Sequence, residues 1–258
     1  MEKVNDQTVP TAIVTGSTKG IGKATAQLLA KRGYNVVICS RNRGDIGKTV
    51  EEIMSEAKAK SISKNKSAPQ VMGLKCDVCD TSDVDSLVKA TMEMFGGIDV
   101  LVNNAGILLY KDLADTSKEE WIKTININLT GTFLFCKTVL PHMVKNNSGV
   151  IINVSSGAGK IGFPKLSAYC ASKFGVMGLS ESLAAEVNEY NIRVMTICPG
   201  EIDTQMINDA VNFGYRLHCK RNEMLKPGDV AQKILDMVTK TSVYRNAQCV
   251  EFYSGISQ

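Results

Sequence analysis

The stretch TAIVTGSTKGIG, residues 11–22, decides the fold of this chain. Its first residues are apolar or β-branched and predict a buried strand, and glycines at 16, 20 and 22 then remove side chains from the turn. A helix that begins near Gly20 would direct its backbone N–H groups and the positive end of its dipole at a phosphate. The spacing is GxxxGxG and differs from the usual nucleotide fingerprint GxGxxG, so other observations must identify the ligand.

Strands and helices alternate along the rest of the chain. The first helix is expected to run to about Arg32. Fully apolar strands that alternate with helices indicate a parallel sheet covered on both faces. We therefore expect an α/β fold, a Rossmann-type doubly wound parallel sheet with helices on both faces, in a single domain over residues 1–258. Further strands are predicted at 35–39, 71–75, 98–102, 150–154, 192–197 and 248–252, and helices at 45–60, 82–95, 118–145, 167–189 and 227–240.

Composition restricts the class of protein. Hydrophobic residues make up 44% of the chain, charged residues 22%, and the net charge is +4, which argues against a nucleic-acid or membrane partner. The first ten residues are not a secretory signal, and no apolar run reaches the roughly 20 residues that cross a bilayer. Scattered cysteines in apolar surroundings indicate reduced thiols and a cytoplasmic protein. We expect no metal site, because the CxxC at Cys76 and Cys79 has no second ligand pair.

One segment, 58–66, is basic and serine-rich. We interpret it as a solvated helix end and loop. The alternative is a docking patch for an acidic carrier or a phosphate-bearing substrate.

The end of the second strand reads CSRN, residues 39–42. In a nicotinamide site an acid often stands there and holds the ribose 2′-OH. Ser40 takes that place and Arg41 follows, and a guanidinium can bind a 2′-phosphate through two hydrogen bonds. Lys19 adds a second positive charge. The sequence therefore predicts NADP(H) as cofactor, with Asp45 interpreted as an acid at a helix start.

Other motifs follow in order: NNAG at 103–106, INLTG at 127–131, NVSS at 153–156, YCASK at 169–173 and PGEIDT at 199–204. Together with TGSTKGIG, this order resembles the short-chain dehydrogenase/reductase family, in its short single-domain branch, over about residues 9–206. The resemblance implies a 3-oxoacyl reductase-like enzyme that prefers NADPH. It also implies a homodimer or homotetramer formed through the helices at 118–145 and 167–189.

The resemblance assigns roles to the matched positions. Tyr169 would be the acid–base residue, and Lys173 on the same helix face would lower its pKa and hydrogen-bond the nicotinamide ribose. Ser156 would hydrogen-bond the substrate carbonyl, with Ser155 as second choice. Asn128, in preference to Asn126, would hold a water for proton relay to Lys173. The implied cofactor contacts are Gly16, Thr18, Lys19, Gly20, Ile21, Gly22, Ser40, Arg41, Asp77, Val78, Asn104, Ala105, Gly106, Ile127, Tyr169, Lys173, Pro199, Gly200, Ile202 and Thr204. For Asn103 a purely structural role in the turn is the alternative.

Two variable segments would select the substrate, 157–167 and a lid at 205–226. Neither His142 nor His218 is assigned a role. The apolar residues in these segments predict a hydrophobic ketone or acyl substrate, and they are Ile161, Phe163, Leu166, Met206, Ile207, Phe213, Tyr215, Met224 and Leu225.

The expected function is an NADPH-dependent carbonyl reductase that transfers hydride from nicotinamide C4 to a ketone or 3-oxoacyl-type substrate. The sequence leaves open 3-oxoacyl thioesters, steroids, sugars, pteridines and xenobiotic carbonyls. One alternative is an NAD-linked alcohol dehydrogenase, against which Arg41 argues. The other is a non-catalytic NADP-binding sensor, which would need no acid–base pair such as Tyr169 and Lys173.

Overall fold

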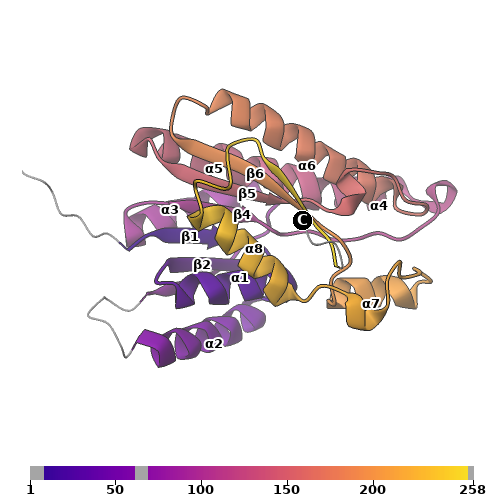
Figure 1. Cartoon of the computed structure of the whole chain (residues 1–258), viewed down its shortest axis with the longest axis horizontal. Coiled ribbons are helices and arrows are strands. Elements are labelled where there is room, and N and C mark those ends of the chain that lie inside the picture. Colours follow the sequence, from indigo (N-terminus) through magenta and orange to yellow (C-terminus); the bar gives the residue numbers. More distant parts are fainter. Residues whose placement is uncertain (1–8, 62–68, 255–258) are drawn as a thin grey trace, which may run out of the picture.

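The strands of the described residues form one parallel sheet, in the order β3-β2-β1-β4-β5-β6-β7 (Figure 1). The computed structural model describes residues 9–61 and 69–254. The order reverses between β1 and β4, and sheets of this kind bind ligands at such a point, beyond the carboxyl ends of the strands. The strands are β1 (Thr11–Val14), β2 (Asn35–Ser40), β3 (Val71–Lys75), β4 (Val100–Asn103), β5 (Gly149–Val154), β6 (Ile192–Pro199) and β7 (Cys249–Phe252).

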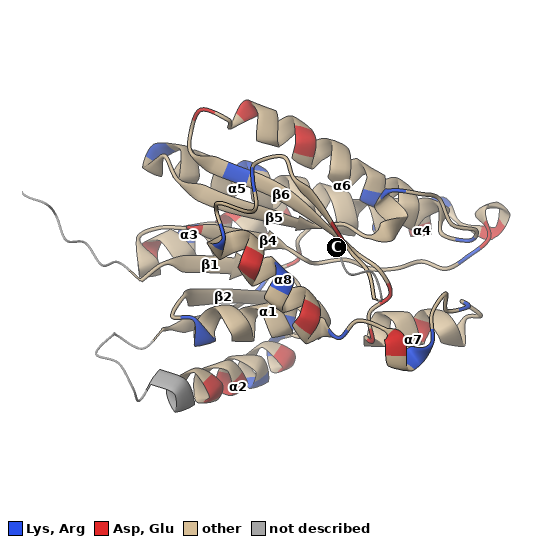
Figure 2. Cartoon of the chain, in the orientation of Figure 1, with Lys and Arg blue, Asp and Glu red and all other residues tan. Residues whose placement is uncertain are grey.

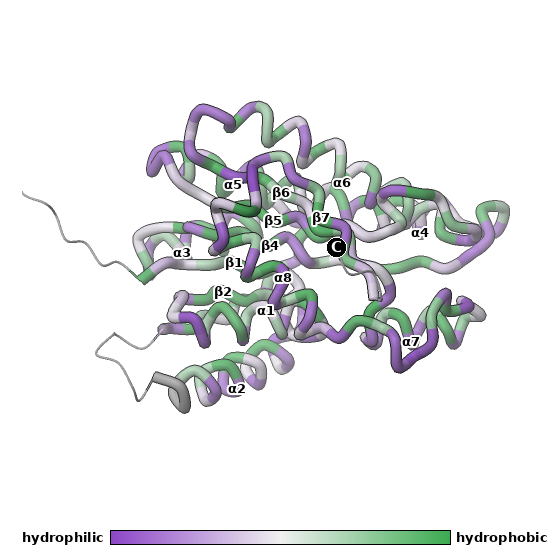
Figure 3. The backbone as a smooth tube through the Cα atoms, viewed as in Figure 1, coloured by the Kyte–Doolittle hydropathy of each residue, from purple (hydrophilic) through white to green (hydrophobic). Residues whose placement is uncertain are grey.

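Helices cover both faces of the sheet, as expected for a doubly wound fold (Figure 1). On one face lie α1 (Gly20–Lys31), α2 (Arg43–Ser61) and α8 (Pro227–Thr239), and on the other lie α3 (Thr81–Phe95), α5 (Gly131–Asn146) and α6 (Ser167–Glu186). Each face of the sheet has its own hydrophobic core, and successive strand residues point into opposite cores. Val14 packs into the core under α1, α2 and α8, and Ile13 packs into the core under α3, α5 and α6. The strands are mostly hydrophobic and the charges gather on the outer helices (Figures 2 and 3).

The single long helix predicted at 118–145 is wrong in one respect. The structure divides it into α4 (Lys118–Ile125), a π-helical turn (Asn126–Thr130) and α5. The wider turn directs the Asn128 side chain inward, where it accepts a hydrogen bond from Ile107 N (2.8 Å) and donates to Ser172 Oγ (2.9 Å). Isolated π turns of this kind occur mostly at functional sites.

The connections between the expected strands and helices contain further short helical elements. The lid segment contains a helix, α7 (Gln205–Asn212), and short 3-10 turns lie at Leu113–Asp115, Gly157–Gly159 and Arg221–Glu223. Most of the basic segment at 58–66 lies outside the described residues, so its interpretation stays a prediction.

Buried amides tie the centre of the sheet to α6. Asn103 Nδ2 donates to Asn153 Oδ1 (2.9 Å), and Asn153 Nδ2 donates to Ser180 Oγ (2.8 Å). Asn103 is only 4% exposed. The structural alternative for Asn103 therefore accounts for its position, because buried polar networks of this kind hold neighbouring elements in register.

Gly22→Ala should destabilise the fold. A Cβ there would lie 2.5 Å from the Gly16 carbonyl oxygen and would also collide with the Asn104 side chain. Overpacking at such a site costs about 1–3 kcal/mol, so thermal unfolding should shift down by several degrees. The control is Gly47→Ala in α2, where an added Cβ meets no atom within 4 Å. That variant should match or exceed the wild type by about 1 kcal/mol. Equal melting temperatures for the two variants would contradict this account.

Candidate active site

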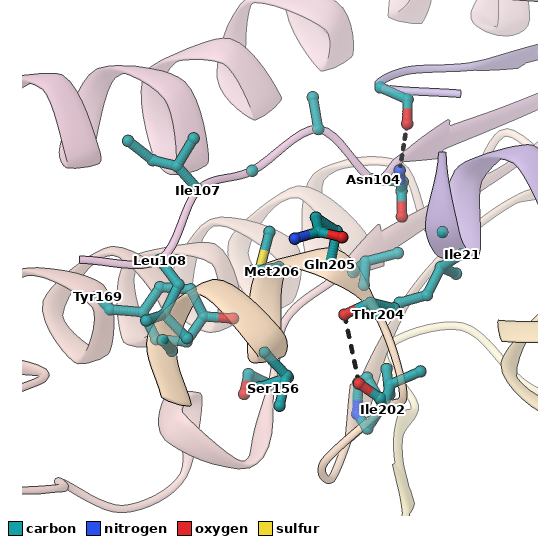
Figure 4. A pocket seen from close by; sticks show the side chains of 18 of the residues that line it. Ile21, Asn104, Ile107, Leu108, Ser156, Tyr169, Ile202, Thr204, Gln205 and Met206 are labelled. Carbon is teal, nitrogen blue, oxygen red and sulfur yellow. Dashed lines mark hydrogen bonds between the residues drawn. The ribbon is translucent and has the colours of Figure 1, made fainter. Parts of the chain in front are cut away.

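A large cavity opens at the carboxyl ends of the central strands, and Figure 4 shows part of its lining. Its volume is about 1020 Å³, at the upper end of the range for small-molecule sites. Ile21 and Asn104 lie at one end of the view, and Tyr169 lies at the other with Ser156 nearby (Figure 4). The cavity therefore joins the glycine turn to Ser156, Tyr169 and Lys173, called the Ser–Tyr–Lys set below.

The turn after β1 is built for a close backbone approach. Gly16 has φ +60°, and a Cβ on it would lie 2.8 Å from Ala105 Cα. Asn104 Nδ2 donates to Thr15 O (2.9 Å) and Gly16 O (3.1 Å), which fastens the β4 turn to the glycine turn. Both features hold the two turns together at the point where the strand order reverses.

The N-terminus of α1 faces the cavity without a capping side chain. Its N-cap residue is Lys19, whose side chain makes no cap hydrogen bond, and the first turn carries no acid. The free N–H groups and the positive end of the helix dipole favour an anion. This end of the cavity therefore fits the phosphates of a dinucleotide.

Arg41 and Ser40 line the same end of the cavity, at the carboxyl end of β2. Arg41 is exposed, and Lys19 Nζ lies 3.8 Å from Asp45 Oδ2. Asp45 stands in the first turn of α2, as its interpretation as a helix-start acid requires. Two cations thus border the place where a ribose would follow the phosphates.

The Ser–Tyr–Lys set converges from β5 and α6. Lys173 is 4% exposed and donates from Nζ to Val154 O (2.8 Å), and its Nζ lies 5.7 Å from the centre of the Tyr169 ring. Ser156 Oγ accepts from Ala158 N (3.1 Å), which leaves its hydroxyl hydrogen free to donate. Ser155 Oγ donates to Lys173 O (3.0 Å) instead. Ser156 is therefore the serine available beside Tyr169.

Burial controls the proton affinities of this set. It raises the pKa of Tyr169 to about 12, although a hydrogen bond with Ser156 opposes the rise. It lowers the pKa of Lys173 to about 8. In the polypeptide alone, desolvation of the phenolate is the largest effect on the Tyr169 pKa, and the Lys173 ammonium donates to Val154 O. The expected lowering of the Tyr169 pKa by Lys173 together with an oxidised nicotinamide stays a prediction.

Asn128 lies behind the cavity wall. It is 1% exposed, and Nδ2 donates to both Ile107 O (2.9 Å) and Ser172 Oγ (2.9 Å). Asn126 is exposed and bonds Thr130. The structure thus separates the two asparagines, and Asn128 links the turn after β4 to α6.

An apolar chamber adjoins Tyr169. Tyr169 packs in one cluster with Leu166, Phe163 and Tyr215, which come from the two variable segments. Leu108 and Tyr110 join them from the turn after β4, a segment that the sequence did not single out. Tyr110 and Tyr215 meet edge to face with centroids 5.4 Å apart.

Three of the expected substrate residues lie elsewhere. Ile161 is 60% exposed and Met224 and Leu225 are buried, and none of the three lines the cavity. Leu225 forms a bridge with Ile202 and packs into the core. The apolar composition of these segments did not show which residues would line the cavity and which would lie in the core or on the surface.

Glu201, which follows β6, holds residues 215–219 in place. Its carboxylate accepts from Tyr215 Oη (2.8 Å), His218 N (3.0 Å) and Cys219 N (3.2 Å). Burial opposes ionisation of Glu201, but these hydrogen bonds prevail and lower its pKa. His218, which the sequence left without a role, lines the cavity and packs edge to face on Phe163.

Most of the implied cofactor contacts line the cavity, and Gly22 does not, because it packs against Gly16 and Asn104. The lining positions are Gly16, Thr18, Lys19, Gly20, Ile21, Ser40, Arg41, Asp77, Val78, Asn104, Ala105, Gly106, Ile127, Tyr169, Lys173, Pro199, Gly200, Ile202 and Thr204.

Two other expectations concern metal and membrane. Within residues 9–61 and 69–254, no group of three or more His, Cys, Asp or Glu side chains is placed to hold a metal ion. In the same residues, no helix is both long and apolar enough to span a bilayer.

The model of the family described as short chain dehydrogenase matches residues 10–213. The chain belongs to this family. It is therefore an oxidoreductase, and the solved structures most like it include levodione reductase, at 28% identity and a TM-score of 0.84 over 95% of this chain and 96% of that one. A variant of actinorhodin polyketide ketoreductase with NADPH matches at 29% identity and a TM-score of 0.85, again over 95% and 96%.

Relatives in sequence point the same way. The 3-oxoacyl-[acyl-carrier-protein] reductase of Thermotoga maritima is 36% identical over 95% of this chain and 96% of its own. The trans-4-hydroxycyclohexanecarboxylate dehydrogenase of Sinomonas cyclohexanicum is 39% identical over 80% of this chain and 78% of its own. The short-chain oxidoreductase thus resembles a 3-oxoacyl reductase, and its relatives also include an enzyme named for a cyclic alcohol.

Lys173→Met should change how stability depends on pH. The pKa of Lys173 is about 8 when folded and 10.5 as the reference value, so between these pH values the unfolded chain binds a proton that the folded chain lacks. Wild-type stability therefore rises with pH in this window by about 2 kcal/mol at pH 9.5, and the variant lacks this gain. As pH rises from 7 to 9.5, the melting temperature of the wild type should increase relative to that of the variant. Parallel curves would contradict the buried, shifted lysine.

Proposed function

We propose that this oxidoreductase is an NADPH-dependent carbonyl reductase that acts on a hydrophobic ketone or 3-oxoacyl-type substrate. The observation that carries the proposal is the convergence of Ser156, Tyr169 and Lys173 between a phosphate-binding helix end and an apolar chamber. The relatives named as reductases and the neighbour solved with NADPH support it.

NADP(H) is the proposed cofactor. Arg41 and Lys19 would hold the 2′-phosphate, and the uncapped start of α1 would hold the pyrophosphate. When bound, the dinucleotide supplies hydride from nicotinamide C4 to the carbonyl carbon. The remaining implied cofactor contacts that line the cavity would position the adenine and nicotinamide rings of the dinucleotide.

Tyr169 is the proposed proton donor to the substrate oxygen. Its raised pKa, about 12, keeps the phenol protonated at neutral pH, which is the form that a reduction consumes. The Ser156 hydroxyl, which accepts from Ala158 N, would donate to the same oxygen and stabilise its developing charge. Lys173 donates one ammonium hydrogen to Val154 O and would donate the others to the hydroxyl groups of the cofactor ribose.

Asn128 is proposed to position these groups. Both of its amide hydrogens are taken, by Ile107 O and Ser172 Oγ. A relay water would therefore bind a second lone pair of its side-chain or backbone oxygen. The backbone oxygen already accepts from Thr132 Oγ1 (2.9 Å).

The chamber beside Tyr169 favours hydrophobic carbonyl compounds over sugars. Tyr110, Phe163 and Tyr215 offer aromatic surfaces, and Leu108 and Leu166 complete the wall. A flat cyclic or a linear acyl ketone would bury its apolar surface there. The lid at 205–226, the single domain, the homodimer or homotetramer and the cytoplasmic localisation stay predictions.

Tyr169→Phe should abolish turnover and leave NADPH binding intact. The change removes one hydroxyl from the proton path, so the rate should fall by at least about 100-fold. The measurement is NADPH oxidation with a panel containing a 3-oxoacyl thioester, a quinone, a diketone and a steroid, together with an NADPH titration. Tyr110→Phe is the control in the same chamber and should retain turnover. Retained turnover by the Tyr169→Phe variant would show that Tyr169 is not the proton donor. If the wild type binds NADPH but turns over no compound of the panel, the non-catalytic sensor is favoured instead.

Arg41→Ala should weaken NADPH binding far more than NADH binding. Loss of a charged pair to the 2′-phosphate should cost roughly 1.5–3 kcal/mol, about 10- to 100-fold in affinity. NADH should change by less than about twofold, since it lacks that phosphate. Arg43→Ala is the matched control, because Arg43 is exposed nearby at the start of α2 and does not line the cavity. Equal losses for both dinucleotides would overturn the cofactor assignment and favour the NAD-linked alternative.

A further inference from the structure

Two cysteines face each other across the last two strands of the sheet. In the β6–β7 register, Cys249 lies opposite Thr196, and Cys198 lies opposite Glu251. The two cysteines are thus offset by two positions, so their side chains emerge on the same face of the sheet. Cys198 Sγ and Cys249 Sγ are 3.5 Å apart. Both thiols are free.

The two thiols have different surroundings. Cys198 is fully buried, and its sulfur contacts Met177 Sδ at 3.5 Å. Cys249 is partly exposed, and Lys160 Nζ lies 3.9 Å from its sulfur. Lys160 also pairs with Glu251 at 3.4 Å, which holds the ammonium beside the edge strand. Solvent and small reagents can therefore reach Cys249 but not Cys198.

These surroundings make Cys249 the reactive thiol. The hydrogen bond with Cys198 and the Lys160 charge lower the pKa of Cys249 to about 7, although burial opposes this. The contact with Cys249, together with burial, raises the pKa of Cys198. The pKa values of Cys79 and Cys219, which are also partly exposed, are raised by burial and by nearby carboxylates. At neutral pH a substantial fraction of Cys249 is therefore thiolate beside the protonated Cys198 thiol, and the thiolate is the form that reacts with oxidants.

We propose that Cys249 and Cys198 form a reversible oxidation site for hydroperoxides. The Cys249 thiolate attacks one peroxide oxygen, the O–O bond breaks, and a sulfenic acid forms, while the leaving oxygen takes up a proton and departs as water from hydrogen peroxide or as an alcohol from an organic hydroperoxide. The Cys198 sulfur then attacks the Cys249 sulfur, the S–S bond forms, the S–O bond breaks, and a water leaves. With hydrogen peroxide, the dithiol loses two electrons and two protons, and the peroxide becomes two waters. A dithiol reductant reverses the step.

The site adjoins the cavity, so oxidation should be felt there. Bond formation shortens the sulfur separation from 3.5 Å to about 2.05 Å. Among the described strands β7 pairs with β6 alone, so β7 is the strand that can yield. Tyr253 follows it, and a Cβ on Gly200 would lie 2.8 Å from the Tyr253 ring. Movement of β7 would therefore disturb the cavity wall at Pro199–Gly200. The expected effect on cofactor binding rests on the proposed function.

The test treats the full chain with dilute hydrogen peroxide and maps its peptides by mass spectrometry without reduction. A Cys198–Cys249 cross-link should form and disappear with dithiothreitol. Cys249→Ser should prevent it. Cys198→Ser should leave a sulfenic acid on Cys249, which dimedone traps. Cys219→Ser is the matched control, a partly exposed cysteine at the same cavity, and it should cross-link like the wild type.

Unlinked Cys198 and Cys249 peptides in protein whose other cysteines are oxidised would overturn the proposal. Dimedone on Cys79 or Cys219, with Cys249 unlabelled in the Cys198→Ser protein, would also overturn it. Neither readout depends on catalysis, so both stand apart from the carbonyl reductase proposal. An NADPH titration should show several-fold weaker binding after oxidation in the wild type and no change in Cys249→Ser. Equal affinity of oxidised and reduced protein would overturn the link to the cavity.

Discussion

The rest of the structure depends on one close approach of two backbones. Where the strand order reverses, the turn after β1 lies against the turn after β4, and Gly16 leaves no room for a Cβ beside Ala105. The Asn104 amide then bonds the carbonyls of Thr15 and Gly16. This contact fixes where α1 begins, and so it fixes which end of the cavity is electropositive.

The opposite end of the cavity depends on burial. Lys173 and Tyr169 come from one turn of α6, but their proton affinities are set mainly by the absence of water around them. The π turn before α5 contributes by inserting Asn128 between the β4 turn and α6. If Tyr169 is the proposed acid, burial already keeps it in the protonated form that a reduction consumes.

Local patterns predicted the sheet because strands follow short-range rules, and the family resemblance implied most of the cavity lining. Apolar runs mark strands, and ligand residues of such folds stand at strand ends, so Arg41 could be placed from sequence, whereas the role of Ser156 came from the family resemblance. Features made by distant contacts could not. The π turn looks like ordinary helix in sequence, and the contact of Tyr110 with Tyr215, from a distant segment, exists only in the folded chain.

Pairings between distant segments escaped for the same reason. Cys198 and Cys249 are 51 positions apart and meet only through the β6–β7 register. Met224 and Leu225 have the composition of a cavity wall, yet they fill the core. The balance between burial and charge at Tyr169 also required the three-dimensional arrangement, because sequence shows the lysine but not how dry the site is.

The position of Glu201 separates two tasks within the molecule. Its backbone follows β6 in the sheet framework, while its carboxylate accepts hydrogen bonds from Tyr215, His218 and Cys219. Segment 213–219 is thereby attached to the framework through a side chain, and the Ser–Tyr–Lys set lies on β5 and α6. An evolving lineage could exchange the shape of this wall, and with it the preferred substrate, while inheriting the oxidoreductase site unchanged.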